Sequence, residues 1–232
     1  MTTPDDDNGD VDMLDVASVP CRAWAPQEEG PYRRDAPPSR RDVADERPGT
    51  PLQLGIRLLR PDGTALPDAD VEIWQCDAFG RYSGFLPPDP GVIVTAESAD
   101  RTEVASEEMF LRGRQSTDMA GMVEFRTVYP GWYPGRTVHV HVIVHAAGTV
   151  FTTQLYFPEA VTDAVFARAP YNERPGRDTT NETDEIFADG GEAASLEVQR
   201  RGPGYWAAAC FTLPVDGDGI DSEGGRTRTA PR

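Results

Sequence analysis

The clearest alternation of hydrophobic and polar positions lies between Thr137 and Ala146, where valine occupies every second position from 138 to 144. Side chains of a β-strand point alternately to opposite faces, so this pattern predicts a strand with one buried face. Further segments of strand type, separated by turn residues, predict five more strands. They lie at 52–58, 70–76, 121–128, 149–157 and 205–213. The Ala-Gly step at 147–148 predicts a hairpin between two of these strands.

One stretch of the chain has the pattern of a helix. Residues 158–169 carry proline and glutamate in the first turn and an apolar stripe behind them, and Pro170 ends the pattern. The polar segment 86–120 has no clear period and is expected to cross the surface as a loop. Strands therefore dominate, and their spacing predicts an all-β fold, a β-sandwich with a short helix and long loops.

The two ends of the chain differ in composition from this central part. Residues 1–18 form an acidic segment with six aspartates, so a disordered tail is expected. Residues 19–51 are rich in proline and charge, which predicts an extended N-terminal arm packing on the domain. Residues 52–213 would form the sandwich, and residues 214–232 a flexible tail rich in Gly, Asp and Arg.

The charge of the chain excludes some partners. Its formal net charge is −17, and all 22 basic residues are arginine. Nucleic acids and anionic membranes both need a basic surface, so neither is expected as a partner. An acidic surface without lysine suits solubility at high salt, although a biased genome composition is an alternative that refolding in low and high salt would test. No stretch approaches the ~20 apolar residues of a membrane span.

The cysteines favour a reducing compartment. Cys21, Cys76 and Cys210 are an odd number, widely spaced and without a C-x-x-C pair. Reduced, partly buried thiols are the expectation, with one bridge plus one free thiol as the alternative. The N-terminus has aspartates where a signal peptide needs positive charge and an apolar run. A cytoplasmic location is therefore expected.

The candidate chemistry lies in the strand at 137–146. His139 and His141 point to one face, roughly 7 Å apart along the backbone, so both imidazoles can bind one metal ion. Plain structural histidines would show the same H-x-H pattern, as would zinc sites. Tyr133 lies in a turn bracketed by proline and glycine just ahead of the strand, and a phenolate oxygen favours a hard cation such as iron(III). Arg136 adds a permanent positive charge beside this site.

Three separated segments of the chain resemble the intradiol ring-cleavage dioxygenases, the family of catechol 1,2-dioxygenase and protocatechuate 3,4-dioxygenase. They are WQCDAFGRYSGF (74–85), YPGWYPGRTVHVH (129–141) and TTQLYF (152–157). The lead-in PCRAWAPQEEGPY (20–32) and the segment 108–133 fit the same family, so the resemblance covers roughly residues 20–213.

The resemblance implies a non-haem Fe(III) site. The tyrosine of the G-x-Y-S motif is an iron ligand in the family and corresponds to Tyr82. The second tyrosine ligand corresponds to Tyr133, and the two histidine ligands to His139 and His141. Two further residues correspond to positions that stabilise the bound catecholate and the oxygenated intermediate. These are Arg136 and Gln154.

The implied function is cleavage of a catechol ring between its two hydroxyl-bearing carbons by O₂, giving a cis,cis-muconate-type dicarboxylic acid. In the family the tyrosine that corresponds to Tyr133 leaves the iron and helps to take up the catechol protons. Two alternatives stay open at this point. One is an inactive β-sandwich that binds a ligand or partner, and the other is zinc in the same site. Retention of all four ligand-type residues together with Arg136 and Gln154 argues against the inactive module. Two phenolates argue against zinc, because a d¹⁰ ion gains little from them.

The chain departs from the family pattern in one connection, and some residues outside the ligand set also have expected roles. Only five residues separate Tyr133 from His139, a shorter connection than in the catechol and protocatechuate enzymes, which leaves the substrate within the catechol class open. Tyr32, in the E-G-P-Y segment, is expected at the mouth of the pocket as a substrate-binding residue. His145 and Trp132 are expected to be structural, and residues 112–114 to be solvated. The chain resembles a compact, single-domain member of the family, and a homodimer is expected from the family.

Overall fold

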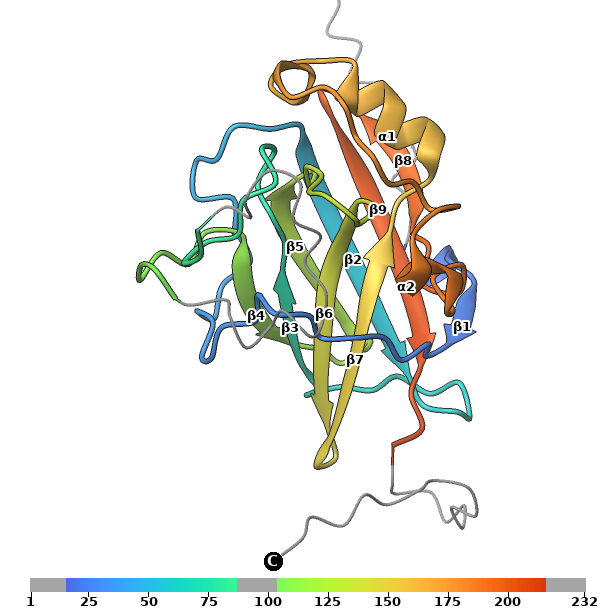
Figure 1. Ribbon diagram of the computed structural model, residues 1–232. Coiled ribbons are helices and arrows are strands. Elements are labelled where there is room, and N and C mark those ends of the chain that lie inside the picture. Colours follow the sequence, from blue (N-terminus) through green and yellow to red (C-terminus); the bar gives the residue numbers. More distant parts are fainter. Residues whose placement is uncertain (1–15, 87–103, 216–232) are drawn as a thin grey trace, which may run out of the picture.

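The protein folds as two β-sheets packed face to face, which confirms the all-β sandwich prediction (Figure 1). The computed structural model describes residues 16–86 and 104–215. One sheet contains β1 (Cys21–Ala23), β2 (Pro51–Leu59), β5 (Met122–Val128), β8 (Glu197–Arg201) and β9 (Gly204–Thr212). The other contains β3 (Asp70–Trp74), β4 (Arg112–Ser116), β6 (His139–Ala146) and β7 (Thr149–Tyr156).

The second sheet, which carries the candidate histidines, is antiparallel throughout and has the order β4-β3-β6-β7. Strands β6 and β7 form the predicted hairpin. Its two turn residues, Ala147 and Gly148, have φ values of +49° and +78°, as a two-residue turn between right-twisted strands requires. In the first sheet β2 lies between β9, to which it is parallel, and β5, to which it is antiparallel.

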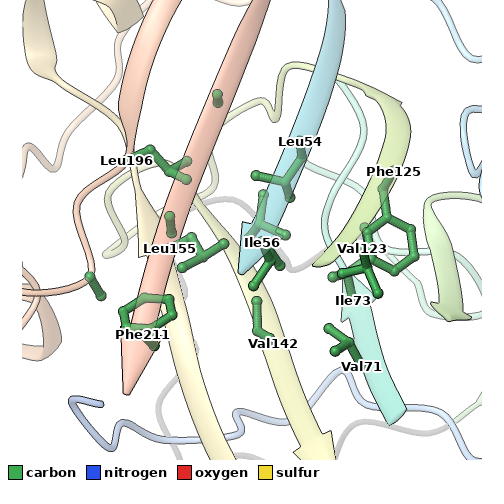
Figure 2. Close-up of a cluster of buried hydrophobic side chains, with 14 of the residues drawn as sticks. Leu54, Ile56, Val71, Ile73, Val123, Phe125, Val142, Leu155, Leu196 and Phe211 are labelled. Atoms are coloured by element: carbon green, nitrogen blue, oxygen red, sulfur yellow. The ribbon is translucent and has the colours of Figure 1, made fainter. Parts of the chain in front are cut away.

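The core lies between the two sheets and is built by the alternating apolar residues of each (Figure 2). From the first sheet come Leu54, Ile56, Val123, Phe125 and Phe211, and from the second come Val71, Ile73, Val142 and Leu155. All of them are almost fully buried. Because successive side chains alternate, the other face of β6 is left free to carry the histidines.

Outside the sheets, the predicted helix is present as α1 (Glu159–Phe166). Three short elements that the sequence pattern did not indicate are η1 (Val16–Ser18), η3 (Tyr171–Glu173) and α2 (Glu185–Ala188). Strands β1, β4 and β8 were also not predicted. They are short and mostly polar, and β4 contains Gly113 because Val43 and Arg40 of the arm pack where a side chain would lie.

Residues 24–50 contain no strand or helix and lie along the domain. Trp24 inserts into the core with its ring edge toward Phe151 and Phe211, and Tyr32 is buried beside the candidate site. Nearly all of the expected tail at 1–18 and of the segment 214–232 lies outside the described residues. Of the expected loop at 86–120, residues 87–103 lie outside them, and in the described remainder the expectation is wrong for Arg112–Ser116, which form β4.

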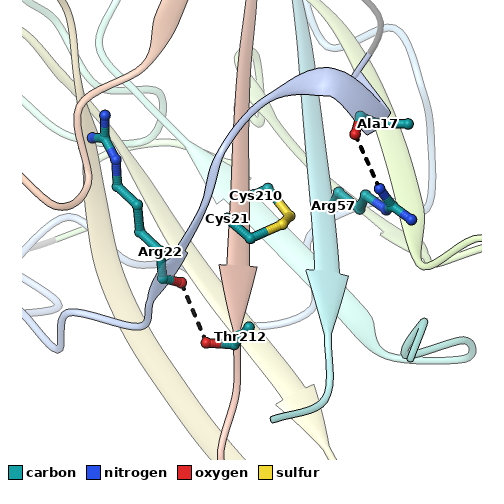
Figure 3. The surroundings of a disulfide bond; sticks show 6 residues. All are labelled: Ala17, Cys21, Arg22, Arg57, Cys210 and Thr212. Atoms are coloured by element: carbon teal, nitrogen blue, oxygen red, sulfur yellow. Dashed lines mark hydrogen bonds between the residues drawn. A yellow bond between two sulfur atoms is a disulfide. The ribbon is translucent and has the colours of Figure 1, made fainter. Parts of the chain in front are cut away.

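The expectation of reduced thiols is wrong for two of the three cysteines. Cys21 on β1 and Cys210 on β9 form a disulfide across 189 residues of sequence (Figure 3). These residues are direct partners in the parallel pairing of β1 with β9, which brings their side chains together. Cys76 is free and buried. The spacing of cysteines in the sequence could not indicate this, because the pairing depends on which strands become neighbours.

None of the helices within the described residues is long and apolar enough to cross a membrane.

Candidate metal centre

Strand β6 places the two candidate histidines side by side on the face opposite the core. Val140 and Val142 point into the core, and the rings of His139 and His141 lie on the other side, both almost fully buried. The two Nε2 atoms are 3.1 Å apart. The indole of Trp74, on neighbouring β3, lies parallel to the His141 ring with centroids 4.7 Å apart. Strand pairing and stacking therefore fix the direction of both imidazoles.

Tyr82 reaches the histidines from the loop that follows β3. A turn at Asp77–Gly80 reverses the chain, and the Asp77 carboxylate stabilises it by accepting hydrogen bonds from the backbone N–H groups of Phe79 and Arg81. Gly80 has φ +76°, a conformation that favours glycine. Tyr82 follows two residues after this turn and is 4% exposed.

Tyr133 comes from the loop between β5 and β6, which packs directly on the Tyr82 loop. The N–H of Gly131 donates to the Asp77 carbonyl at 3.1 Å, and a Cβ atom at Gly131 would lie 2.5 Å from the Ala78 carbonyl oxygen. A Cβ at Gly80 would collide with the carbonyl of Trp132. Glycines on both sides therefore allow the two backbones close enough for the phenols of Tyr82 and Tyr133 to meet the same histidines.

The four side chains converge on one small volume. The Tyr82 hydroxyl is 3.0 Å from His141 Nε2 and 3.4 Å from His139 Nε2, and the Tyr133 hydroxyl is 3.2 Å from His139 Nε2. Two donor atoms that each lie about 2.0–2.1 Å from one ion, with a donor–ion–donor angle between about 90° and 109°, would be about 2.9–3.4 Å apart. The spacing between these donor atoms is thus the spacing that a common metal ion requires.

The protonation of the histidines suits metal binding. Burial, together with the nearby Arg136 charge, lowers the pKa of His139 to about 3, and burial also lowers the pKa of His141 well below its ordinary value. Both rings are therefore neutral near pH 7. His139 Nδ1 lies 2.6 Å from the Thr137 carbonyl oxygen, so Nδ1 carries the proton and Nε2 keeps its lone pair toward the tyrosines.

The two phenols, in contrast to the histidines, must lose a proton before they can bind a metal ion. Burial raises the pKa of Tyr133 to about 12, and burial also raises the pKa of Tyr82 well above its ordinary value. Both phenols therefore hold their protons in the metal-free protein and would lose them on binding a cation. Within the described residues no cluster of three or more His, Cys, Asp or Glu side chains could hold a metal, so this candidate centre depends on the two tyrosines.

The donor set fits iron(III). Two neutral imidazoles and two phenols that become anionic on binding give nitrogen and hard oxygen ligands, which suit a hard, highly charged cation. Zinc gains less from two phenolates, since structural and catalytic zinc sites are built from Cys, His and carboxylate ligands.

Arg136 lies next to this centre but is not a free cation. Its Nε donates to the Asp184 carboxylate at 2.9 Å, and its Nη2 donates to Gln154 Oε1 at 2.5 Å. Gln154 also accepts from the Tyr156 hydroxyl and donates through Nε2 to the Glu28 carbonyl. Among the described residues, no hydrogen-bond partner is found for Arg136 Nη1, so both of its N–H groups can donate to another molecule.

Asp184 was not among the residues selected from the sequence. It is 2% exposed and stands before α2 as the N-cap, with its Oδ1 accepting from the N–H groups of Ile186 and Phe187. An Asp ahead of a short apolar stretch could have indicated the cap. Nothing local could have indicated the ion pair with Arg136, because 48 residues separate the two in sequence.

The arm closes the site from the other side. The Tyr32 ring stacks on Tyr82, with centroids 4.3 Å apart and planes at 12°, and its edge meets Phe85 and Tyr133. A Cβ at Gly30 would lie 3.2 Å from His141 Cε1, so a side chain at this position of the arm would press on the imidazole. Tyr32, which was expected at the pocket mouth, is buried and packs against the candidate ligand Tyr82. Phe85 was missed by the sequence analysis.

Three further expectations can be compared with the structure. Arg112, expected to be solvated, is 1% exposed and donates to the side chain and carbonyl of Ser83. It is buried because β4 lies against the loop that carries Tyr82, an arrangement that a polar five-residue strand does not reveal. His145 pairs with Glu72 at 3.1 Å, away from the metal centre, and Trp132 packs with its Nε1 bonded to the Arg174 carbonyl.

Comparison with known proteins gives consistent results. A family model described as a dioxygenase matches residues 27–173. Among solved structures, an intradiol ring-cleavage dioxygenase from Tetranychus urticae is 29% identical, with a TM-score of 0.77, over 85% of this chain and 97% of that one.

Two curated relatives match shorter parts of the chain. The β chain of a protocatechuate 3,4-dioxygenase from Burkholderia cepacia is 30% identical over 112 residues, which are 44% of this chain and 42% of the relative. A chlorocatechol 1,2-dioxygenase from Cupriavidus pinatubonensis is 27% identical over 157 residues, 57% of this chain and 54% of the relative. The matches thus span about half the length of these relatives.

Proposed function

Because the chain belongs to the intradiol ring-cleavage dioxygenase family, whose members are oxidoreductases, we propose that it cleaves a catechol-type ring between its two hydroxyl-bearing carbons. O₂ is the second substrate, and both of its atoms enter a cis,cis-muconate-type dicarboxylic acid. The observation that carries this proposal is the convergence of Tyr82, Tyr133, His139 and His141. The Tyr82 hydroxyl lies 3.4 and 3.0 Å from the Nε2 atoms of His139 and His141, the Tyr133 hydroxyl lies 3.2 Å from His139 Nε2, and the two Nε2 atoms are 3.1 Å apart.

These four residues would hold a non-haem Fe(III) ion. Bound there, the ion would withdraw electron density from a coordinated catecholate and so activate it toward O₂. Phenolates stabilise the ferric state, and the two neutral imidazoles complete the set. The buried surroundings, with Tyr32 and Trp74 packed against the ligands, exclude water from this side of the centre.

Tyr133 is the residue that would take up a catechol proton at its Oη. In the metal-free protein, burial raises its pKa to about 12, compared with about 10 for an ordinary phenol, so this phenol favours its protonated form when no cation binds it. Its phenolate, when not bound to a cation, can therefore accept a proton from a catechol hydroxyl.

Arg136 would bind the anionic substrate through Nη1, the one nitrogen of its guanidinium that has no partner within the described residues. A hydrogen bond aimed at developing negative charge in a buried site stabilises it more than the same bond in water. Gln154 has its amide committed to Arg136, Tyr156 and the Glu28 carbonyl, so it would act by orienting Arg136 and not by direct contact.

The experiment is metal loading followed by a substrate panel. The protein loaded with ferric ion should be red-brown from tyrosinate-to-iron charge transfer, and it should consume O₂ with catechol, hydroxyquinol or a substituted catechol and form the corresponding diacid. A protein that binds no iron and stays colourless would support a binding module without activity. Colour without O₂ uptake on any catechol would retain the iron site and refute the proposed reaction.

A further inference from the structure

The carboxylate of Asp184 has all of its hydrogen bonds directed at two neighbouring elements. Oδ1 accepts from the N–H groups of Ile186 and Phe187 at 2.8 and 2.9 Å, which anchors the carboxylate on α2. Oδ2 accepts from Arg136 Nε at 2.9 Å and from the Thr137 N–H at 2.7 Å. One buried side chain thus connects α2 to the start of the segment that leads into β6.

The hydrogen bond between Asp184 and Arg136 Nε determines the direction in which the Arg136 guanidinium points. A guanidinium is planar, so fixing two of its nitrogens fixes the whole group. Asp184 holds Nε and Gln154 holds Nη2, and together they leave Nη1 pointing in a single defined direction. The negative charge of Asp184 also balances the Arg136 cation, which would otherwise lie uncompensated in a buried site at a high energetic cost.

A second hydrogen bond of Asp184, from the Thr137 N–H, determines the position of the Thr137 backbone. Its N–H is bonded to Asp184, its hydroxyl lies 2.7 Å from Asn181 Oδ1, and its carbonyl accepts from His139 Nδ1. Gly135, one residue before Arg136, donates its N–H to Asp178 Oδ1. The segment 178–184 therefore supports the backbone from which both Arg136 and His139 project.

We propose that Asp184 is a positioning residue for catalysis, which fixes the Arg136 guanidinium so that Nη1 faces the substrate. This inference rests on the proposed function, because it assigns the role of Asp184 through that of Arg136. Asp184 does not touch the substrate itself. Misplacement of a binding group by about 1 Å can lower the rate about 10²-fold, which is the loss expected when this support is removed.

The test is a double-mutant cycle between Asp184→Asn and Arg136→Ala on the iron-loaded protein. Each single variant should lower kcat/KM for catechol about 10²-fold, and the double variant should lose no more than Arg136→Ala alone. Iron content and the charge-transfer band should be unchanged in all three. A readout without metal is the exchange rate of the Arg136 Nε–H by NMR in the metal-free protein, which should rise in Asp184→Asn.

Two controls separate positioning from loss of stability. Leu54→Ala removes core packing in the opposite sheet and should lower the melting temperature without changing kcat/KM of the folded protein. Asp184→Glu retains the charge, so its kcat/KM should be at least tenfold higher than that of Asp184→Asn. The same variant provides the comparison with wild type if Asp184→Asn does not fold.

The inference would be overturned if Asp184→Asn kept the kcat/KM of the wild type. It would also be overturned if the loss of kcat/KM in Asp184→Asn added fully to that of Arg136→Ala in the double variant, or if the kcat/KM of Asp184→Glu were no higher than that of Asp184→Asn. An iron-free or inactive wild-type protein would instead refute the proposed function.

Discussion

The disulfide between Cys21 and Cys210 gives the most direct prediction about stability. It joins the first strand of the described residues to the last, so nearly all of the described domain lies within the closed loop. The change to make is the double substitution Cys21→Ser/Cys210→Ser, which keeps side chains of similar size. The expected result is a less stable protein with the same fold.

The magnitude follows from the length of the loop. Closing a loop of 189 residues removes unfolded-state entropy equivalent to about 5 kcal/mol at 25 °C in the chain-entropy description. In a domain of this size 1 kcal/mol shifts the melting temperature by about 2–4 °C, so the expected decrease is about 10–20 °C. Measured effects of disulfides often fall below this relation, which makes about 5 kcal/mol the upper end.

The assay is thermal unfolding of wild type and variant, each with and without reductant. Reductant should lower the melting temperature of the wild type to that of the variant and leave the variant unchanged. Thiol titration of the denatured, non-reduced wild type should find one reactive thiol, that of Cys76. Three reactive thiols, or melting temperatures within about 2 °C of each other, would refute the reasoning. A stabilising bridge would favour an oxidising compartment, in place of the reducing one expected from the sequence.

Three other predictions test the site. His139→Ala should abolish iron binding and colour together, measured by metal analysis and visible absorption, and a coloured, active variant would contradict the ligand assignment. Gly80→Ala should lower both stability and iron content more than Gly148→Ala, because the two glycines share a positive φ but only Gly80 faces a packed backbone. Burial opposes ionisation of Asp184, but Arg136 and the backbone hydrogen bonds outweigh it and lower its pKa. The stability that Asp184 adds is therefore present at pH 7 and lost as pH falls through that lowered pKa, so denaturation of Asp184→Asn and wild type should differ less at pH 3 than at pH 7.

The parts of the fold that were predictable from the sequence are those with local signals. Strand β6 and the β6–β7 hairpin follow from a period-2 pattern and a two-residue turn, both of which are contained within a few positions. Strands β1, β4 and β8 carry no such pattern, since they are short and lie at exposed or mostly polar positions. Their formation depends on neighbours that the chain brings together only in the folded state.

The same distinction applies to the site. The H-x-H spacing places His139 and His141 on one face by strand geometry alone. The burial of Asp184 and Arg112 depends on contacts between segments far apart in sequence. Both are charged residues of a kind usually found on the surface. Their burial is understandable only from their partners, which are Arg136 and Thr137 for Asp184 and the Ser83 side chain and carbonyl for Arg112.

The arm is the segment in which fold and candidate function are most closely connected. Its Gln27 and Glu28 bond to Tyr156 and Gln154, and four residues later Tyr32 stacks on Tyr82. The disulfide at Cys21 anchors the start of this same segment to β9. Because the arm contacts a candidate ligand and the residue that orients Arg136, loosening it would disturb the site before the sandwich itself unfolds. Local opening of the arm needs less free energy than global unfolding of the domain. The Cys21→Ser/Cys210→Ser variant should therefore lose substrate affinity at temperatures below its melting transition.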